Sequence, residues 1–449
     1  MRHESDLETE DMVAALSQPD PDLERPGPNG WTRRKFLTAV GAGAIGAVAS
    51  TELFGGVPSA WAAPLTTSEG IIVTVTMYGG YDGLNVVVPY TNSTYYGRRP
   101  GLAIAPEQVL QINNAIGWAP QLTTLKSLYD SGQVAVVQGV GYANPNLSHF
   151  DSMKIWMRGS IGNPLQESGW LGRWLDGLSA TSADLAAAGL NTLLPMHLVG
   201  ANRKGVTIPI DGNNFGASSV PADLRLYDGI KRLAANAGRG GWHDAFTATM
   251  KSQLEVASLV APTFTGAAAP AGDELTRQLT VAARLINANL GLRVIDVSTS
   301  GLDHHVNQAP GLTAKLTDLD RGLAAFFAEL APGRRPQVTV VVLTEFGRTI
   351  GVNGSLGTDH GTTNPMFLIG SKVNGGLYGS MPSLTTLDSH GRQLAQVDFR
   401  SIYGSILDGW MGGGGSTVLG GSFEDLRLFS GPPGPGTTPT PTTPTTTAP

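Results

Sequence analysis

The sequence predicts an α/β fold, a doubly wound and mostly parallel sheet flanked by helices. Short, nearly continuous runs of apolar and β-branched residues recur along the chain, as in strands buried on both faces of a parallel sheet. Between these runs lie segments with an apolar residue every three or four positions, as in helices that bury one face. Strands that alternate with such helices are typical of a doubly wound sheet.

The predicted strands are four to seven residues long and, apart from Asp296, contain no Asp, Glu, Lys or Arg. They are Ile71–Met77, Val134–Val137, Met196–Val199, Val294–Val297, Val338–Leu343 and Met366–Ile369. Helical spacing predicts helices over residues 312–330 and 275–290, and a third helix that begins near Leu122 and precedes the strand at Val134. Gly272 and Asp273 stand where the helix over 275–290 should begin.

The first 62 residues resemble a twin-arginine (Tat) export signal. Arg33 and Arg34 precede a charge-free run over residues 38–51, and Ala60-Trp61-Ala62 forms a small-x-small cleavage site. The run is too short and too rich in glycine to span roughly 30 Å of hydrocarbon, which favours cleavage over a membrane anchor. We therefore expect the Tat translocase to be a partner during export. The mature protein would be extracytoplasmic (cell envelope, periplasm or secreted), with no stable membrane span.

Residues 63–430 are predicted to form the folded domain. Within it, residues 160–270 are rich in Gly, Asn and Ala and weak in periodicity, which predicts an insertion or lid. Residues 431–449 consist of Thr, Pro, Gly and one Ala, which predicts a disordered tail.

Composition excludes several classes of function. The chain has no Cys, which excludes thiolate catalysis, Cys-ligated zinc, iron–sulfur clusters and disulfide bonds. A net charge of −6 argues against a nucleic-acid-binding protein.

Residues that can bind a divalent cation follow the predicted strands. Ligands of open parallel sheets bind beyond the carboxyl ends of the strands. In a chain without Cys, the expected ligands of a divalent cation are carboxylates and neutral His. Together, the acidic residues and histidines that follow these strands predict a metal or catalytic site. Its candidate residues are Asp82, Ser148, His149, Asp303, His305, Glu345, Asp359 and His360.

Spacing separates some of these candidates from their neighbours. Asp303 and His305, two apart in an extended chain, would present both side chains to one side, and His304 would point away. Asp359 and His360 lie in a loop flanked by glycines, where backbone segments can approach closely.

Each candidate also has a purely structural explanation. Asp82, between glycines, could shape a turn. Glu345 could form a buried ion pair with Arg348. Ser148, with Asp151 three residues later, could be only a helix N-cap.

Several segments resemble the DUF1501 family, in the expected order through nearly all of residues 71–429. They are TMYGGYDGLNVVVPY, NPNLSHFDSMKIWMRG with GWLGRWL, VIDVSTSGLDHHVNQ, VVVLTEFGRTIGVNGSLGTDHGTTNPMFLIG and VDFRSIYGSILDGWMG. Members of this family are exported, often with Tat signals, and the family is grouped with the alkaline phosphatase and sulfatase superfamily.

The resemblance implies a metal-dependent hydrolase that acts on a small anionic substrate, a phosphate or sulfate ester. Asp82 would be the ligand after the first strand, and Ser148 would stand at the nucleophile position. His149 would be an acid or a ligand. The later ligands would be Asp303, His305, Glu345, Asp359 and His360. The metal would be zinc, calcium, magnesium or manganese.

Departures from the superfamily pattern keep a second class of function open. Glu345-Phe346 stands where alkaline phosphatases carry an Asp-His pair, so one of two metal sites would be incomplete. The nucleophile would be Ser148 or a hydroxide on the metal. The alternative is a non-catalytic exported protein of the cell envelope that uses the same fold to bind a glycan or a partner.

Overall fold

The computed structural model describes residues 64–161, 167–179, 185–190, 193–210, 240–264 and 270–431, together with isolated positions between 221 and 268. The predicted signal peptide and all but the first residue of the predicted tail lie outside these residues. Across the described ranges, no helix is both long and apolar enough to cross a membrane.

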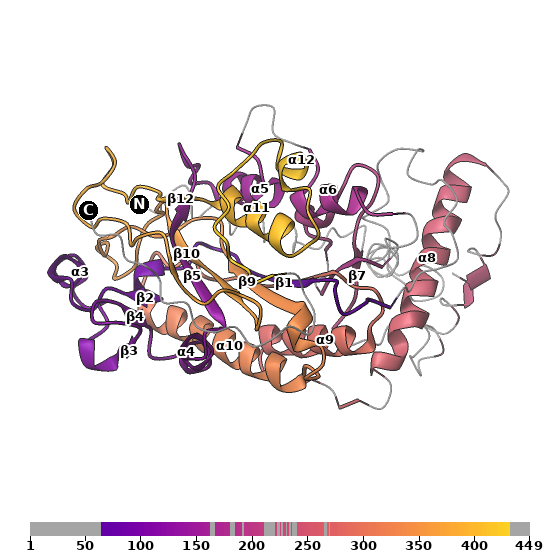
Figure 1. The fold of residues 1–449 in the computed structure, drawn as a ribbon, viewed down its shortest axis with the longest axis horizontal. Helices are drawn as coiled ribbons and strands as arrows, with labels where there is room; N and C mark the ends of the chain where they lie inside the picture. The colour runs from indigo at the N-terminus through magenta and orange to yellow at the C-terminus, as the bar shows by residue number, and fades with distance from the viewer. Residues whose placement is uncertain are drawn as a thin grey trace.

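A nine-stranded sheet organises the described part of the chain (Figure 1). Its strand order is β11-β5-β10-β9-β1-β8-β6-β7, and β12 also pairs with β5. The strands are β1 (Ile71–Met77), β5 (Val134–Gly141), β6 (Ala187–Gly189), β7 (Val206–Thr207), β8 (Val294–Thr299), β9 (Val338–Leu343), β10 (Asn364–Ile369), β11 (Gly376–Tyr378) and β12 (Val397–Asp398). β10 runs antiparallel to β9 and β5, whereas the other pairings are parallel. The predicted fold class, a mostly parallel α/β sheet, is confirmed.

Helices cover both faces of this sheet (Figure 1). One face carries α4 (Thr123–Asp130), α9 (Glu274–Ala288) and α10 (Gln308–Glu329). The other carries α5 (His149–Arg158), α6 (Trp170–Asp176), α11 (Phe399–Gly409) and α12 (Gly415–Leu419). The remaining helices are α3 (Ser93–Arg98) and α8 (Gly241–Phe264), with 3-10 turns η2 (Gly83–Asn85), η3 (Pro106–Gln108), η4 (Met196–Leu198) and η5 (Arg335–Gln337). A second, small sheet consists of β2 (Val87–Val88), β3 (Leu110–Gln111) and β4 (Gly117–Trp118).

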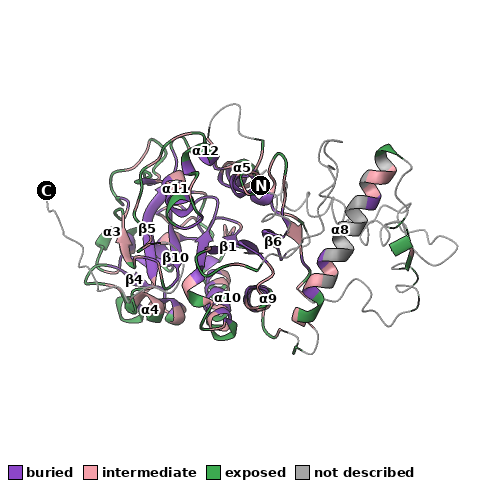
Figure 2. Ribbon diagram, turned by 45° about the vertical axis from the view of Figure 1, so that its right-hand side comes forward, coloured by how far each residue is buried: buried purple, intermediate pink, exposed green. Residues whose placement is uncertain are grey.

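The alternation of side chains along β1 divides the core into two layers. Val73 packs in the cluster that includes Leu279 of α9 and Leu323 of α10. Its neighbour Ile72 packs in the opposite cluster, with Ile402 of α11. Because both faces of the strand are covered, nearly every residue of β1 is apolar or β-branched. Figure 2 shows the strands buried and the outer surfaces of α4 and α10 exposed.

Two strand predictions need correction. Residues Met196–Leu198 form η4 and not a strand: Pro195 caps the turn, and the buried His197 ring reaches Asp296 of β8 at 3.1 Å. The strand at Met366 exists but is antiparallel, an orientation that periodicity does not reveal. Within the predicted insertion, β6 and β7 extend the large sheet beside β8.

The predicted start of α9 is confirmed at Asp273, whose carboxylate accepts hydrogen bonds from the Thr276 N–H at 2.9 Å and the Thr276 hydroxyl at 2.6 Å. Burial raises the pKa of Asp273, but these bonds and Arg321 outweigh burial and lower it. A carboxyl group with a lowered pKa in the folded state stabilises the protein above its unfolded pKa, and this stability is lost as the pH falls through the folded pKa.

We therefore expect Asp273→Asn, which keeps a capping oxygen, to be less stable than wild type near neutral pH. The difference in urea-unfolding free energy should shrink as the pH falls below about 4. A difference that stays constant over this range would contradict the assigned role of the charge.

Candidate metal centre

One edge of the sheet gathers the candidate side chains. β1, β5, β8 and β9 are mutually parallel in direction, so their carboxyl ends share this edge. β10 is antiparallel and therefore begins there. His149 follows β5 as the first residue of α5, Asp303 follows β8, Glu345 follows β9 and His360 precedes β10.

His149, Asp303 and His360 form the centre of this group. Each offers one ligand atom, and the three atoms lie within 4.8 Å of one another. His149 Nε2 is 3.3 Å from Asp303 Oδ2, and His360 Nε2 is 3.1 Å from Asp303 Oδ1. His149 Nε2 is buried and makes no hydrogen bond within the described residues, although it lies within ion-pair distance of Asp303.

The second ring nitrogen of each of these histidines is held by an acceptor. His149 Nδ1 is 2.7 Å from Glu345 Oε1, and His360 Nδ1 is 2.8 Å from the carbonyl oxygen of Leu147. An acceptor at Nδ1 keeps the proton on that nitrogen and leaves a lone pair on Nε2. Metal-binding histidines are oriented in this way, by a carboxylate or a backbone carbonyl on the far nitrogen.

His305 lies beside the three-residue centre. Its Nε2 is 3.0 Å from Asp303 Oδ1 and 3.1 Å from His360 Nε2, and its Nδ1 is 3.1 Å from Asp359 Oδ1. Asp303 and His305 thus share one side of the chain, as the sequence predicts. The ring of His304 points instead toward Gly311 of α10, where its Nε2 leaves no room for a Cβ.

Arg348 stabilises the loops that carry the centre. Its guanidinium is almost completely buried and donates to Asp303 Oδ1 at 2.5 Å. The same group donates to four backbone carbonyls, those of Gly79, Gly80, Leu302 and Thr358. The suggested ion pair between Arg348 and Glu345 is therefore wrong, because Arg348 pairs with Asp303.

Glu345 contacts the ring nitrogen of His149 that points away from the centre. It is 1% exposed, and its Oε1 accepts a hydrogen bond from the Gly79 N–H at 2.8 Å in addition to its contact with His149. Its Oε2 accepts from the Thr344 hydroxyl at 2.8 Å. Glu345 is placed to orient a ligand, and Asp359 has the same position relative to His305.

Close backbone approach packs these loops together. Gly79 has φ +114°, and a Cβ there would lie 2.6 Å from the Asp303 nitrogen. At Gly361 a Cβ would lie 2.4 Å from the Arg348 carbonyl oxygen. The ring of Phe346 packs against both His149 and His360, with centroids 4.7 Å apart in each case. The two imidazoles are therefore fixed on their apolar side as well as at Nδ1.

The pKa shifts of His149 and Asp303 reflect how strongly the carboxylates of this group favour positive charge. Burial lowers the pKa of His149, but the Asp303 and Glu345 carboxylates outweigh burial and raise it to about 9. Burial raises the pKa of Asp303, yet the neighbouring histidines and Arg348 hold it far below its usual range. In the absence of a cation, protons occupy the place that the carboxylates make favourable for positive charge.

The donor set fits a divalent cation. Two imidazole nitrogens and one carboxylate oxygen lie within 4.8 Å of one another, close enough for one cation to reach all three at bond lengths of about 2.0–2.2 Å after small movements of the side chains. Three protein ligands leave one position open, as in catalytic zinc sites. The buried Nε2 of His149, without a hydrogen-bond partner in the described structure, would gain one.

Asp82 does not join this group. Its Oδ2 accepts from Arg99 at 2.5 Å and from Gln308 Nε2 at 2.6 Å, and all of these groups are buried. Arg99 also donates to the carbonyls of Ile350 and Thr349, each at 2.8 Å. The prediction of Asp82 as a first-strand ligand is corrected accordingly: a fully buried guanidinium 17 residues later takes its charge and anchors the loop before Asp359.

Ser148 is the N-cap of α5, with its Oγ accepting from the Asp151 N–H at 3.5 Å. It is exposed and lies between Leu147, whose carbonyl holds His360, and His149. The cap is thus present, and Ser148 directly precedes His149 of the centre.

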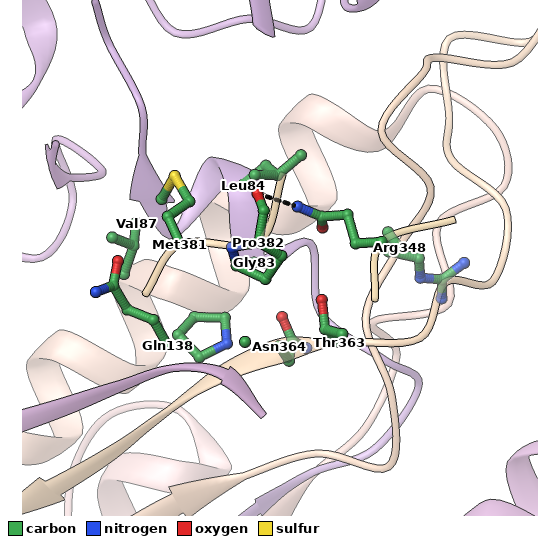
Figure 3. Close-up of a pocket in the computed structure, with 12 residues that line it drawn as sticks. Gly83, Leu84, Val87, Gln138, Arg348, Thr363, Asn364, Met381 and Pro382 are labelled. Atoms are coloured by element: carbon green, nitrogen blue, oxygen red, sulfur yellow. Dashed lines mark hydrogen bonds between the residues drawn. The ribbon is translucent and has the colours of Figure 1, made fainter. Parts of the chain in front are cut away.

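A small cavity of about 20 Å³ lies beneath this region, between η2, β5 and β10 (Figure 3). Gln138 and Asn364 line it, and each has a buried side-chain oxygen with no hydrogen-bond partner in the described structure. In Figure 3 the Arg348 guanidinium points away from the cavity. The volume suits a single water molecule and is too small for a substrate.

Three features that support the centre could not be predicted from the sequence. They are the Leu147 carbonyl, the Phe346 ring and the pairing of Arg348 with Asp303. A backbone carbonyl has no residue signature. Phe346 and Arg348 flank Gly347, where a Cβ would meet the Thr363 carbonyl, and this glycine is the one local signal that the loop is tightly packed.

Comparison with known proteins gives one family and several distant structures. A family model described as "Protein of unknown function (DUF1501)" matches residues 131–396. A protein named Ps i-CgsB is 10% identical, with a TM-score of 0.35, and the match covers 81% of this chain and 75% of that chain. An alkaline phosphatase superfamily protein from Vibrio parahaemolyticus is 8% identical, with a TM-score of 0.32 and coverage of 76% and 71%.

Phosphonoacetate hydrolase from Sinorhizobium meliloti, in complex with phosphonoacetate, is 11% identical, with a TM-score of 0.27 and coverage of 64% and 60%. These scores are too low to support an inference about function. No curated protein matches the chain by sequence.

Proposed function

The chain belongs to the DUF1501 family, and we propose that this member is an exported, metal-dependent hydrolase of phosphate or sulfate esters. The observation that carries the proposal is the His149–Asp303–His360 centre, in which both histidines are held at Nδ1 and share Asp303 through Nε2.

The donor set favours a transition metal. Two imidazole nitrogens and one carboxylate, with His305 alongside, suit zinc better than magnesium or calcium, which prefer oxygen ligands. When bound, a divalent cation would neutralise charge on the oxygens of the ester group. His149, Asp303 and His360 would hold it, while Glu345 and the Leu147 carbonyl keep the rings in place.

Charge at the centre explains why the substrate would be an anionic ester. Three carboxyl groups (Asp303, Glu345 and Asp359) surround it, and Arg348 supplies one balancing guanidinium that is already bonded to Asp303. Without a cation this edge would repel an anion. A divalent cation would cancel the two remaining negative charges and offer its open coordination position to an oxygen of the ester.

Ser148 is the nucleophile in this proposal. Its hydroxyl lies at the N-terminus of α5, where free backbone N–H groups and the helix dipole favour an anionic substrate. Attack by Oγ on phosphorus or sulfur would break the bond to the leaving oxygen and release the alcohol, which takes a proton. Water would then hydrolyse the phosphoserine or sulfoserine and release inorganic phosphate or sulfate.

Metal analysis together with hydrolysis of an aryl phosphate and an aryl sulfate tests this function. We expect about one divalent cation per chain and turnover that chelation abolishes. Ser148→Ala should lose turnover and about 1 kcal/mol of capping, whereas Ser148→Asp should keep the cap and lose turnover.

Two outcomes would redirect the assignment. Full turnover by Ser148→Ala would remove Ser148 from the chemistry and leave it as a helix cap. A stably bound cation with no turnover of either ester would favour the non-catalytic binding protein.

Export remains part of the proposal and is supported by Arg33-Arg34 and Ala60-Trp61-Ala62. A metal loaded into the folded protein in the cytoplasm suits a pathway that carries folded proteins. Retention of the precursor in the cytoplasm after both arginines are replaced by lysine would support it, and unchanged export would overturn it.

A further inference from the structure

A groove of about 630 Å³ is lined by chain segments that lead to the metal centre. It lies between the segment that follows β5, residues 142–145, and the segment that leads into β12, within residues 388–398, and Thr362 also lines it. Binding sites for small molecules usually have volumes of about 300–1,000 Å³, so the groove has room for a ring-sized body.

The groove and the centre are built from the same two segments of chain. Residues 142–145 continue directly to Leu147 and His149, and Thr362 is two residues after His360. The Tyr142 hydroxyl accepts from the Asn146 N–H at 2.9 Å and contacts Ser152, whose hydroxyl donates to the Glu345 carbonyl at 2.7 Å. A ligand in the groove would therefore lie next to the ester held at the centre.

The charged side chains that line the groove differ in whether they already have a hydrogen-bond or ion-pair partner. The Asp388 carboxylate accepts from the N–H groups of His390 and Arg392, each at 2.8 Å. Asp398 is bonded to Arg400 at 2.7 Å. In the described residues the guanidinium of Arg392 has neither a hydrogen bond nor an ion pair, although the nearby Asp388 carboxylate interacts with it electrostatically. The guanidinium of Arg392 therefore still has hydrogen-bond donors that a ligand in the groove could use.

The rest of the lining provides apolar and neutral polar contacts. Leu394 is 44% exposed, one of five large apolar side chains that the described part of the chain leaves exposed. Pro145 lies opposite, on the other segment of the lining, and the amides of Asn144 and Gln396 are exposed. An apolar ring face together with a group that carries negative charge matches these contacts.

We propose that this groove binds the alcohol part of the ester, a ring-bearing body that carries a second anionic group, and that Arg392 recognises that group. The proposal rests on the hydrolase function given above and names its substrate class: esters with two separated negative charges. Arg392 acts on binding and leaves the chemistry at the centre unchanged.

A matched pair of esters tests the proposal, naphthyl phosphate and the same phosphate with a sulfonate on the naphthyl ring. We expect wild type to have the lower KM for the sulfonated ester. Arg392→Gln should raise that KM about tenfold and leave the KM for naphthyl phosphate unchanged, because only one charge-assisted contact is lost. Arg392→Lys should recover part of the difference. Arg98→Gln, which removes an exposed charge from α3, is the matched control and should change neither KM.

Binding of the product separates failure of this proposal from failure of the hydrolase function. Naphthol sulfonate should bind wild type about tenfold more tightly than Arg392→Gln, as measured by its fluorescence, even if no ester is hydrolysed. Equal affinity of the two proteins for naphthol sulfonate, or equal KM values for the two esters in wild type, would overturn the proposal.

Discussion

Asparagine in place of Asp303 is expected to remove the bound cation and, with it, ester hydrolysis. Asp303 contacts His149, His305, His360 and Arg348, so the neutral amide would lose every charge-assisted contact at once. Loss of a residue that merely orients a ligand lowers metal affinity about 10–100-fold. Loss of the shared carboxylate should lower zinc affinity by more than about 100-fold, and turnover should fall at least in proportion.

Zinc titration and metal analysis of the purified full chain measure this effect. Asp82→Asn is the matched control, since Asp82 is a buried carboxylate on the same edge of the sheet that pairs with Arg99 and Gln308. It should lower the melting temperature and keep the zinc stoichiometry. A full zinc complement in Asp303→Asn, or loss of zinc in Asp82→Asn alone, would contradict the assignment of the centre.

Methionine in place of Arg348 should produce the largest loss of stability. The substitution keeps the apolar stem but removes the guanidinium that donates to Asp303 and to four backbone carbonyls. Removing one partner of a buried ion pair costs about 3–5 kcal/mol, a large part of the usual 5–15 kcal/mol of folding stability. Lysine should not restore it, because it has no planar fork of donors.

Urea unfolding in the presence of a chelator measures the loss of folding stability in Arg348→Met without any contribution of the cation. Arg321→Met is the control: Arg321 pairs with Asp273 at 3.2 Å and is 54% exposed, so its loss should cost at most about 1 kcal/mol. An Arg348→Met protein within about 1 kcal/mol of wild type would show that water replaces the lost donors.

The fold could be predicted from sequence because its signals are local. β1 and β9 are runs of apolar and β-branched residues that a two-sided environment explains, β8 is similar apart from Asp296 and its last two residues, and Asp273 identifies the start of α9. Met196–Val199 has the same apolar character but is too short to distinguish a strand from the turn that Pro195 starts. The antiparallel direction of β10 depends on its partners and has no trace in its own residues.

The site could be predicted only in part, because only some of its features are local in the sequence. The two-residue spacing of Asp303 and His305 is a local property, and the structure brings both to the centre. Asp82 looked equivalent to them because it also follows a strand. Its actual partner, Arg99, comes from a different loop, and which of several charges meets it is decided by packing over long sequence distances. Roles of this kind cannot be assigned from residue type and position alone.

The reversal of β10 has a consequence for the order in which the site assembles. Because β9 and β10 are antiparallel neighbours, the loop from 344 to 363 needs no crossover helix and can close early, bringing Glu345, Arg348 and His360 together through local contacts. His149 and Asp303 come from distant parts of the chain and meet only when β5 and β8 have joined the sheet. A cation that needs all three ligands would bind after this late step. It would therefore slow unfolding and leave the rate of folding unchanged.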